Sequence, residues 1–355
     1  MHMSDALVSP AVGGVMWCVS AGALALASRV ADGSRERLVP AMGVLGAFVF
    51  AAQMINFSIP LTGSSGHLGG GLLLAVILGP WAALLTIASV LVVQALFFAD
   101  GGLLALGCNI FNMGVLPCLL ICPFVYAPLA GKEASPFRLG LAAVLSSVLA
   151  LQAGAFAVVL ETLCSGVTAL PFRSFLFLMQ LIHLPIGVVE GLATALLLLA
   201  LRRRGGALVQ ALPVAAVREE SGEVSSAAGL GRKLAVLSMA ALVMGGVAAW
   251  FASPLPDGLE WSVSGVADGE AEVGVRSEWA SKAASLQRVL SPMPGYAFRT
   301  DGIAEAEEPP SWPGVDLGTT AAGVAGSVLV ALLIGGVALM LRPGKEGRIV
   351  GGERR

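Results

Sequence analysis

The sequence predicts an all-α integral membrane protein, a polytopic bundle of about nine spans. Of its 355 residues, 56% are hydrophobic and only 12% are charged, and the mean hydropathy is +0.85. Apolar stretches of bilayer-crossing length recur along the chain. Together these features exclude an ordinary soluble globular protein. The formal net charge of −2 gives no indication of nucleic-acid binding, so the expected surroundings are the lipid bilayer.

Seven apolar runs are long enough to cross a bilayer as single helices. They lie near residues 9–28, 39–57, 103–127, 139–161, 174–201, 234–252 and 320–341. The run 68–98 is ambiguous, because Gly79-Pro80 interrupts it. It could form one tilted helix or two short ones.

Basic residues decide between these two possibilities. They form four clusters: Arg29, Arg35 and Arg37; Lys132 and Arg138; Arg202 to Arg204 with Arg218, Arg232 and Lys233; and Arg342 to Arg355. The positive-inside rule places all four clusters in the cytoplasm, which requires 68–98 to cross twice. We therefore expect nine spans in a cell membrane, with the N-terminus outside and the C-terminus cytoplasmic.

The spans divide into two units. Residues 1–201 form a seven-span unit, 202–233 a cytoplasmic linker, 234–341 a two-span unit and 342–355 a basic tail. The external segment 253–319 holds eleven acids and four bases. It could raise the local cation concentration, but a plain soluble lobe is the favoured interpretation.

The first two residues form a candidate metal chelate. The α-amine of Met1 and the backbone amide and Nδ1 of His2 would close a five- and a six-membered ring around one ion. Planar nitrogen ligation suits Ni(II) and Cu(II). The alternative is a frayed chain end without a role. The other histidines are His67 and His183, so the fourth corner of a planar site has few candidates.

His67 lies in a glycine-rich stretch on the same predicted side as Met1-His2. Flanking glycines allow close approach to another segment, and Ser64 and Ser65 could bond to metal ligands. The alternative is an interfacial histidine in a turn.

Polar residues within the spans are further candidates. His183 and Glu190 are seven residues apart on one helical face. Glu190 is the only carboxylate well inside a predicted span, so it could line an ion path, although a brace or a pair with His183 is favoured. Asn109 and Asn112 are expected to form interhelical hydrogen bonds.

These motifs resemble a known family, CbiM/NikM, the substrate-binding membrane components of energy-coupling-factor (ECF) transporters for nickel and cobalt. The resemblance covers residues 1–201. It rests on the opening Met1–Pro10 and on stretches within Gln53–Gly102, Cys108–Gly114 and His183–Gly187. Pro256–Ser262 resembles the PDGLE-type accessory component, so the chain looks like a fused protein of the NikMN type.

The resemblance implies both a site and a mechanism. The metal ligands would be the Met1 amine, the His2 amide and imidazole nitrogens and the His67 imidazole. Asp5 joins the candidates for a supporting shell or ion path. Nickel is the favoured substrate, with cobalt as the alternative, and no organic cofactor is expected. No nucleotide-binding motif is present, so a transmembrane coupling subunit and two cytoplasmic ABC ATPases would drive transport.

Three alternatives stay open at this point. A cobalt importer for cobalamin biosynthesis would use the same site. A secondary metal carrier would need no ATPases. Gly63–Gly66 also matches the G-x-S-G pattern of rhomboid intramembrane proteases, with Ser65 and His183 as a possible dyad. That interpretation leaves Met1-His2 and the PDGLE stretch unexplained, so we do not expect an enzyme.

Overall fold

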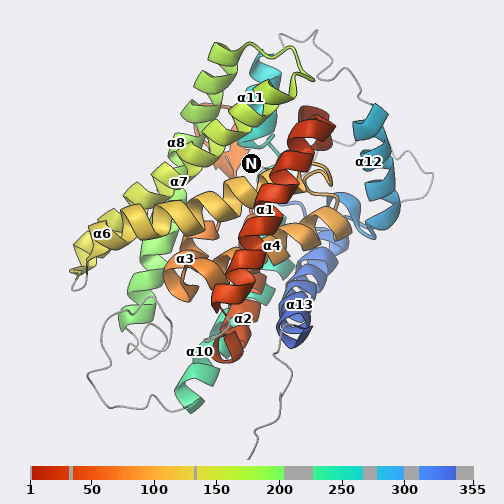
Figure 1. Cartoon of the computed structure of the whole chain (residues 1–355). Coiled ribbons are helices and arrows are strands. Elements are labelled where there is room, and N and C mark those ends of the chain that lie inside the picture. The colour runs from red at the N-terminus through yellow and green to blue at the C-terminus, as the bar shows by residue number, and fades with distance from the viewer. Residues whose placement is uncertain are drawn as a thin grey trace, which may run out of the picture.

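The computed structural model describes residues 2–31, 35–131, 134–203, 227–266, 278–299 and 312–340. It confirms the predicted helical membrane bundle (Figure 1). Six helical segments are long and apolar enough to cross a membrane: α1 (Pro10–Val30), α4 (Pro80–Phe97), the continuous rod Leu106–Ala130, α7 (Pro136–Ser165), α8 (Phe172–Arg203) and α13 (Leu317–Met340). Two further helices, α2 (Arg35–Gln53) and α10 (Ala227–Gly246), carry shorter apolar stretches.

The rod consists of α5 (Leu106–Ile110), η3 (Phe111–Tyr126) and α6 (Ala127–Ala130). Its central part, η3, has π-helical hydrogen bonding and contains Pro117 and Pro123. Wider turns of this kind accommodate local interruptions of the regular helical ladder.

Helix α3 (Gly71–Leu78) corrects the predicted path of residues 68–98. It has eight residues, which is a length of about 12 Å at 1.5 Å per residue, too short to cross a bilayer. All of its residues are buried, so this apolar stretch is enclosed by protein instead of spanning lipid. Gly79 (φ 83°) then turns the chain into α4. The run therefore contributes one long helix and one buried half-helix.

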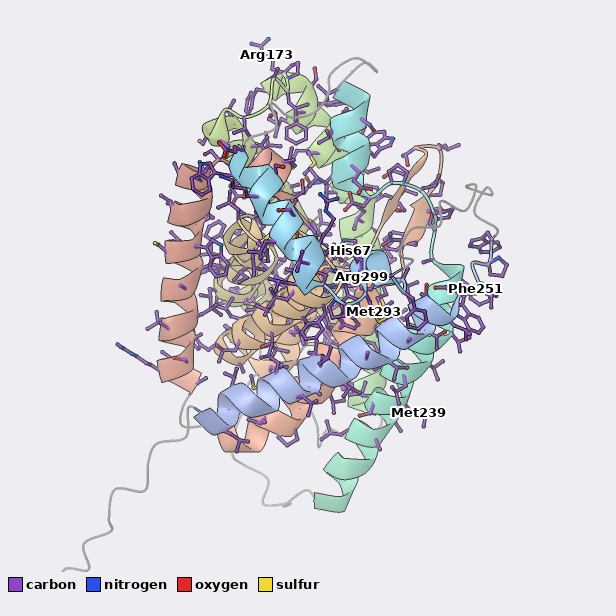
Figure 2. All side chains as sticks on the ribbon, turned by 90° about the vertical axis from the view of Figure 1, so that its right-hand side faces the viewer. His67, Arg173, Met239, Phe251, Met293 and Arg299 are labelled. Atoms are coloured by element: carbon purple, nitrogen blue, oxygen red, sulfur yellow. The ribbon has the colours of Figure 1, made fainter. Side chains whose placement is uncertain are left out.

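Lipid-like surroundings fit the outer surface of the bundle. Large apolar side chains such as Met239 on α10 are exposed there, whereas His67 lies in the interior (Figure 2). An exposed apolar surface of this extent is unusual for a soluble protein and is expected where helices face hydrocarbon.

The C-terminal helices pack on α2 of the first unit. Gly245 on α10 and Gly323 on α13 allow these two backbones to approach closely, and Gly326 makes room for the buried ring of Phe50 on α2. Small residues at helix contacts are typical of membrane bundles. Of the predicted linker, residues 204–226 lie outside the described residues, as does the tail 342–355.

The predicted external segment 253–319 does not form a separate lobe in its described parts. The segment follows η4 (Ala248–Phe251). It contains α11 (Gly258–Val266), α12 (Glu278–Leu290) and η5 (Pro294–Tyr296). These elements lie against one end of the bundle (Figure 1). The same end carries the hairpin of β1 (Phe57–Ile59) and β2 (Ser64–Gly66), which pair antiparallel.

Close packing of α7 against α8 gives a stability prediction. A methyl group at Gly191 would lie 2.4 Å from the Cα of Val144, whereas one at Gly140 would be 3.9 Å from Ala195. We expect Gly191→Ala to lower the free energy of unfolding by about 1–3 kcal/mol through overpacking. Gly140→Ala should be neutral or raise it by up to about 1 kcal/mol. Thermal unfolding of both variants in detergent tests this, and equal stabilities would contradict it.

Candidate metal site

The N-terminal segment is folded into the bundle from His2 onward. Met3 is fully buried, and its N–H donates to Asn109 Oδ1 at 2.7 Å. Its carbonyl accepts from Asn109 Nδ2 at 3.1 Å and from the Gly102 N–H at 2.8 Å. The frayed-end alternative is therefore wrong for this segment. The side-chain amide of Asn109 anchors the segment, because it bonds to both the N–H and the carbonyl of Met3 as a neighbouring β-strand would.

Asp5 secures the other end of this short segment, within η1 (Asp5–Leu7). Its carboxylate accepts the N–H groups of Leu103 at 3.1 Å and Ala105 at 2.9 Å. A side chain at Gly102 would collide with Asp5, which explains the need for glycine there. Asp5 thus docks the segment onto the backbone of Leu103 and Ala105.

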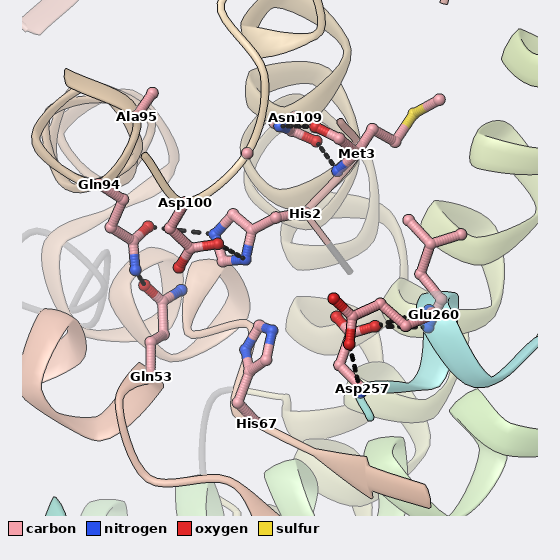
Figure 3. Close-up of polar contacts among 12 residues, drawn as sticks. His2, Met3, Gln53, His67, Gln94, Ala95, Asp100, Asn109, Asp257 and Glu260 are labelled. Atoms are coloured by element: carbon pink, nitrogen blue, oxygen red, sulfur yellow. Dashed lines mark hydrogen bonds and ion pairs between the residues drawn. The ribbon is translucent and has the colours of Figure 1, made fainter. Parts of the chain in front are cut away.

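His2 and His67 lie side by side although 65 positions separate them. Their ring centroids are 5.1 Å apart and the planes are tilted by 24°. His67 follows β2 directly and points towards His2 (Figure 3). Met1, the third predicted ligand residue, lies outside the described residues.

The tautomer and charge of the His67 ring suit metal binding. Its Nδ1 lies 3.1 Å from the Leu68 carbonyl, which can only accept, so the proton belongs on Nδ1 and the lone pair on Nε2. Burial, with the nearby His2, lowers the pKa of His67 to about 3. The ring is therefore neutral at physiological pH.

Two residues that sequence analysis did not single out contact His2, and a third bonds to one of them. Its Nε2 lies 3.1 Å from Gln94 Oε1, and its Nδ1 lies 3.4 Å from Asp100 Oδ1. Gln94 in turn bonds to Gln53 at 2.9 Å. A glutamine in an apolar helix is no distinctive signal in a single sequence, and only the fold brings Gln53 and Gln94 together.

Glu190 supports the loop that carries His67. Its carboxylate accepts the N–H of Gly69 at 2.7 Å and that of Gly70 at 3.2 Å. These groups precede α3, so Glu190 caps this half-helix from α8. This is the brace favoured by the sequence, made to backbone and not to His183.

His183 faces a small cavity beside the site. Its Nδ1 donates to the Met179 carbonyl at 2.7 Å. The cavity is lined by Gly66, His67, Gly69, Leu151, His183, Ile186, Asp257 and Gly258. An ion-path role for His183 stays a prediction.

Ser64 and Ser65 correct another expectation. Ser65 Oγ donates to the Leu255 carbonyl at 2.7 Å, and Ser64 Oγ lies 3.2 Å from the Pro256 carbonyl. The Ser65 N–H also donates to Pro256, at 2.8 Å. These serines therefore hold the PDGLE stretch instead of bonding to the ligand imidazoles. Within the described residues, Ser65 and His183 share no hydrogen bond, which leaves the protease dyad without support.

Asp257 of the PDGLE stretch brings a carboxylate to the site, as Figure 3 shows. Its Oδ1 caps α11 by accepting from Leu259 at 2.9 Å and Glu260 at 2.8 Å. Burial acts to raise the pKa of Asp257, but neighbouring charge and the hydrogen bond from the Glu260 N–H outweigh it and hold the pKa below its usual range. The group is therefore an anion.

The accessory segment, residues 253–266 and 278–296, also contacts the chain around His2. Gln287 Nε2 donates to the carbonyls of Ala95 at 2.9 Å and Gly101 at 2.6 Å. Tyr296 donates to Asp100 Oδ2 at 2.5 Å. The described parts of this accessory segment thus contact the surroundings of both histidines.

Asn112 binds a second buried carboxylate. Its Nδ2 donates to Glu161 Oε2 at 2.8 Å, and Glu161 is only 7% exposed. Glu161 lies at the end of the predicted span 139–161 and four residues before the end of α7 at Ser165, so α7 adds a buried helical acid that the sequence analysis did not single out.

The donor set differs from an ordinary side-chain metal centre. Across the described ranges, no three His, Cys, Asp or Glu side chains gather in a way that could hold an ion.

Two family profiles match the chain. Residues 2–208 match the family described as cobalt uptake substrate-specific transmembrane region, and residues 231–343 match the PDGLE domain. The chain belongs to the cobalt uptake substrate-specific transmembrane family, CbiM. It is a metal-transport component of the CbiM/NikM type and not an enzyme.

Individual relatives agree with this assignment. A putative metal transport protein of Haloquadratum walsbyi is 34% identical over 197 residues, covering 55% of this chain and 87% of that protein. The fused nickel transport protein NikMN of Rhodobacter capsulatus is 32% identical over 162 residues, covering 45% and 46%. A crystal structure of a truncated transition metal transporter has a TM-score of 0.50 and 31% identity, covering 57% of this chain and 99% of that one.

Loss of the Glu190 brace should weaken metal binding. Glu190→Gln places an amide NH₂ against two backbone N–H donors, so at least one of them loses its acceptor. We expect nickel affinity to fall by about 10–100-fold, as for other groups that support metal ligands. Glu278→Gln, whose side chain is exposed, is the control. Calorimetric titration measures both, and an unchanged Glu190→Gln variant would exclude the brace.

Proposed function

We propose that this protein is the substrate-binding component of an ATP-driven nickel uptake transporter. It captures Ni(II) from the cell exterior with the Met1 amine, the His2 amide and Nδ1, and the His67 imidazole. Cobalt in the same site is the alternative. The single observation that carries the proposal is the buried pair of His2 and His67, whose ring centroids are 5.1 Å apart.

The environment of this pair supports a cation site. One ion bonded to both rings at about 2 Å per nitrogen is compatible with that centroid separation. Asp100 and Asp257 add carboxylates next to the two imidazoles. The anchoring of Met3 by Asn109 fixes the backbone directly after His2, which is what chelation by terminal backbone groups requires.

Transport would depend on other subunits. We infer a transmembrane coupling subunit of the ECF type and two cytoplasmic ABC ATPases, since the chain's sequence carries no nucleotide-binding motif. The N-terminus would face the exterior of the cell membrane, because Arg29 at the far end of α1 favours a cytoplasmic position for that end. Nickel is preferred over cobalt because it favours planar nitrogen ligation.

Removal of His67 should abolish the site. The purified chain is expected to bind one equivalent of Ni(II) with the yellow, diamagnetic spectrum of a planar complex, and His67→Ala should lose it. Metal content and visible absorption after separate loading with Ni(II) and Co(II) test this. Preferential Co(II) retention would make the substrate cobalt, and absence of both metals from the wild type would refute the proposal.

Residues added before Met1 should stop uptake. An extension moves the terminal amine away from His2 and replaces it with a peptide nitrogen, so one chelate ring is lost. We expect nickel accumulation in cells carrying the full transporter to fall to background with a short N-terminal extension. The same residues added after Arg355 serve as the control. Full uptake by an unprocessed extended protein would contradict ligation by the amine.

A further inference from the structure

We propose that Gln53 and Gln94 form a one-way hydrogen-bond relay that holds His2 with its proton on Nε2 and its lone pair on Nδ1. The inference rests on the proposed function, in which Nδ1 of His2 binds the metal. The relay connects the loop that carries His67 to the ring of His2.

The relay begins at a group whose role cannot change. The Gly69 carbonyl can only accept a hydrogen bond, and Gln53 Nε2 lies 2.8 Å from it. The amide of Gln53 must therefore present its NH₂ to Gly69. Its Oε1 then faces the opposite way, towards α4.

Each following step is set by the one before it. Gln53 Oε1 accepts from Gln94 Nε2 at 2.9 Å, so Gln94 directs its Oε1 to His2. That oxygen is 3.1 Å from His2 Nε2. An amide oxygen has no proton to give, so Nε2 must carry the proton and donate it.

The opposite direction of the relay is unfavourable. If both amides were reversed, Gln53 Oε1 would face the Gly69 carbonyl, acceptor against acceptor. Gln53 is 5% exposed and Gln94 is fully buried. A buried polar atom without a partner is costly, which makes the observed direction the stable one.

The far side of the His2 ring is suited to a cation. Nδ1 lies 3.4 Å from Asp100 Oδ1, longer than the roughly 2.7–2.9 Å of a charge-assisted hydrogen bond. Tyr296 holds the other oxygen of Asp100. With the proton on Nε2, the Nδ1 lone pair and the carboxylate leave a place for positive charge between or beside them. Gln53 and Gln94 are thus positioning residues for the metal ligand.

The chain is well suited to a direct test, because it has three histidines. Imidazole ¹⁵N labelling gives two ring signals per histidine, and His67→Ala and His183→Ala variants assign them. In metal-free protein in mildly alkaline buffer, we expect His2 to be protonated at Nε2 and not at Nδ1.

Matched variants test the role of the relay. Gln94→Met removes the acceptor at similar size, and His2 should then show a mixture of tautomers with nickel affinity lowered by about 10–100-fold. Gln94→Glu keeps an acceptor for Nε2–H, so its tautomer and affinity should lie closer to the wild type. Gln180→Met is the control. The side-chain NH₂ groups of Gln180 and Gln152 each donate to the other residue's backbone carbonyl elsewhere in the bundle, and loss of the Gln180 amide should change neither the tautomer of His2 nor the nickel affinity.

The outcomes separate this inference from the proposed function. His2 protonated at Nδ1, or at both nitrogens, would overturn the relay even if nickel binds. An unchanged tautomer and affinity in Gln94→Met would do the same. The expected tautomer, lost in Gln94→Met, together with a wild-type chain that binds no nickel would support the relay and refute the proposed function.

Discussion

Gly69 is the residue on which both halves of the site depend. Its N–H is held by Glu190 of α8 and its carbonyl by Gln53 of α2. The first bond fixes the loop of His67, and the second begins the contacts that reach His2. Because Gly69 has no side chain, the carboxylate of Glu190 can approach closely; a Cβ there would lie 3.0 Å from Oε2. The N–H and the carbonyl of one residue thereby couple the positions of two imidazoles on separate segments.

The accessory segment adds a second coupling between the same two halves. Residues 253–261 bond to the hairpin before His67, and residues 287–296 bond to the chain around Asp100. Displacement of residues 253–261 would break contacts on the His67 side, and displacement of residues 287–296 would break contacts on the His2 side. The fused accessory unit therefore supports the surroundings of both histidines.

The sequence predicts most of the bundle and the two histidines, and the reasons are local. Apolar run lengths report membrane helices directly, and a histidine after the initiator is visible without a fold. It located the break at Gly79-Pro80 but could not predict that α3 is enclosed by protein, because an apolar run of eight residues has the same pattern in lipid and in a protein interior. Nor could it predict Gln53 and Gln94, whose importance arises from contacts 16 to 92 positions apart, or Asp257, which only the fold brings to the cavity beside His67. The same limit explains Ser64 and Ser65, whose hydroxyls bond to a distant backbone segment.

The remaining difficulty for such a site is electrostatic. The N-terminus of a helix carries about half a positive charge, which suits anions, and α3 begins four residues after His67. A divalent cation nearby would be repelled if no negative charge lay at the N-terminus of α3. Glu190 bonds to the N–H groups at this end, so it offsets the positive end where it arises. At an effective dielectric constant of 20, unit charges 4 Å apart interact by about 4 kcal/mol, so a half charge still has a sizeable effect. In the proposed site, Glu190 would therefore favour cation binding through α3 as well as through the loop that carries His67, without being a metal ligand itself.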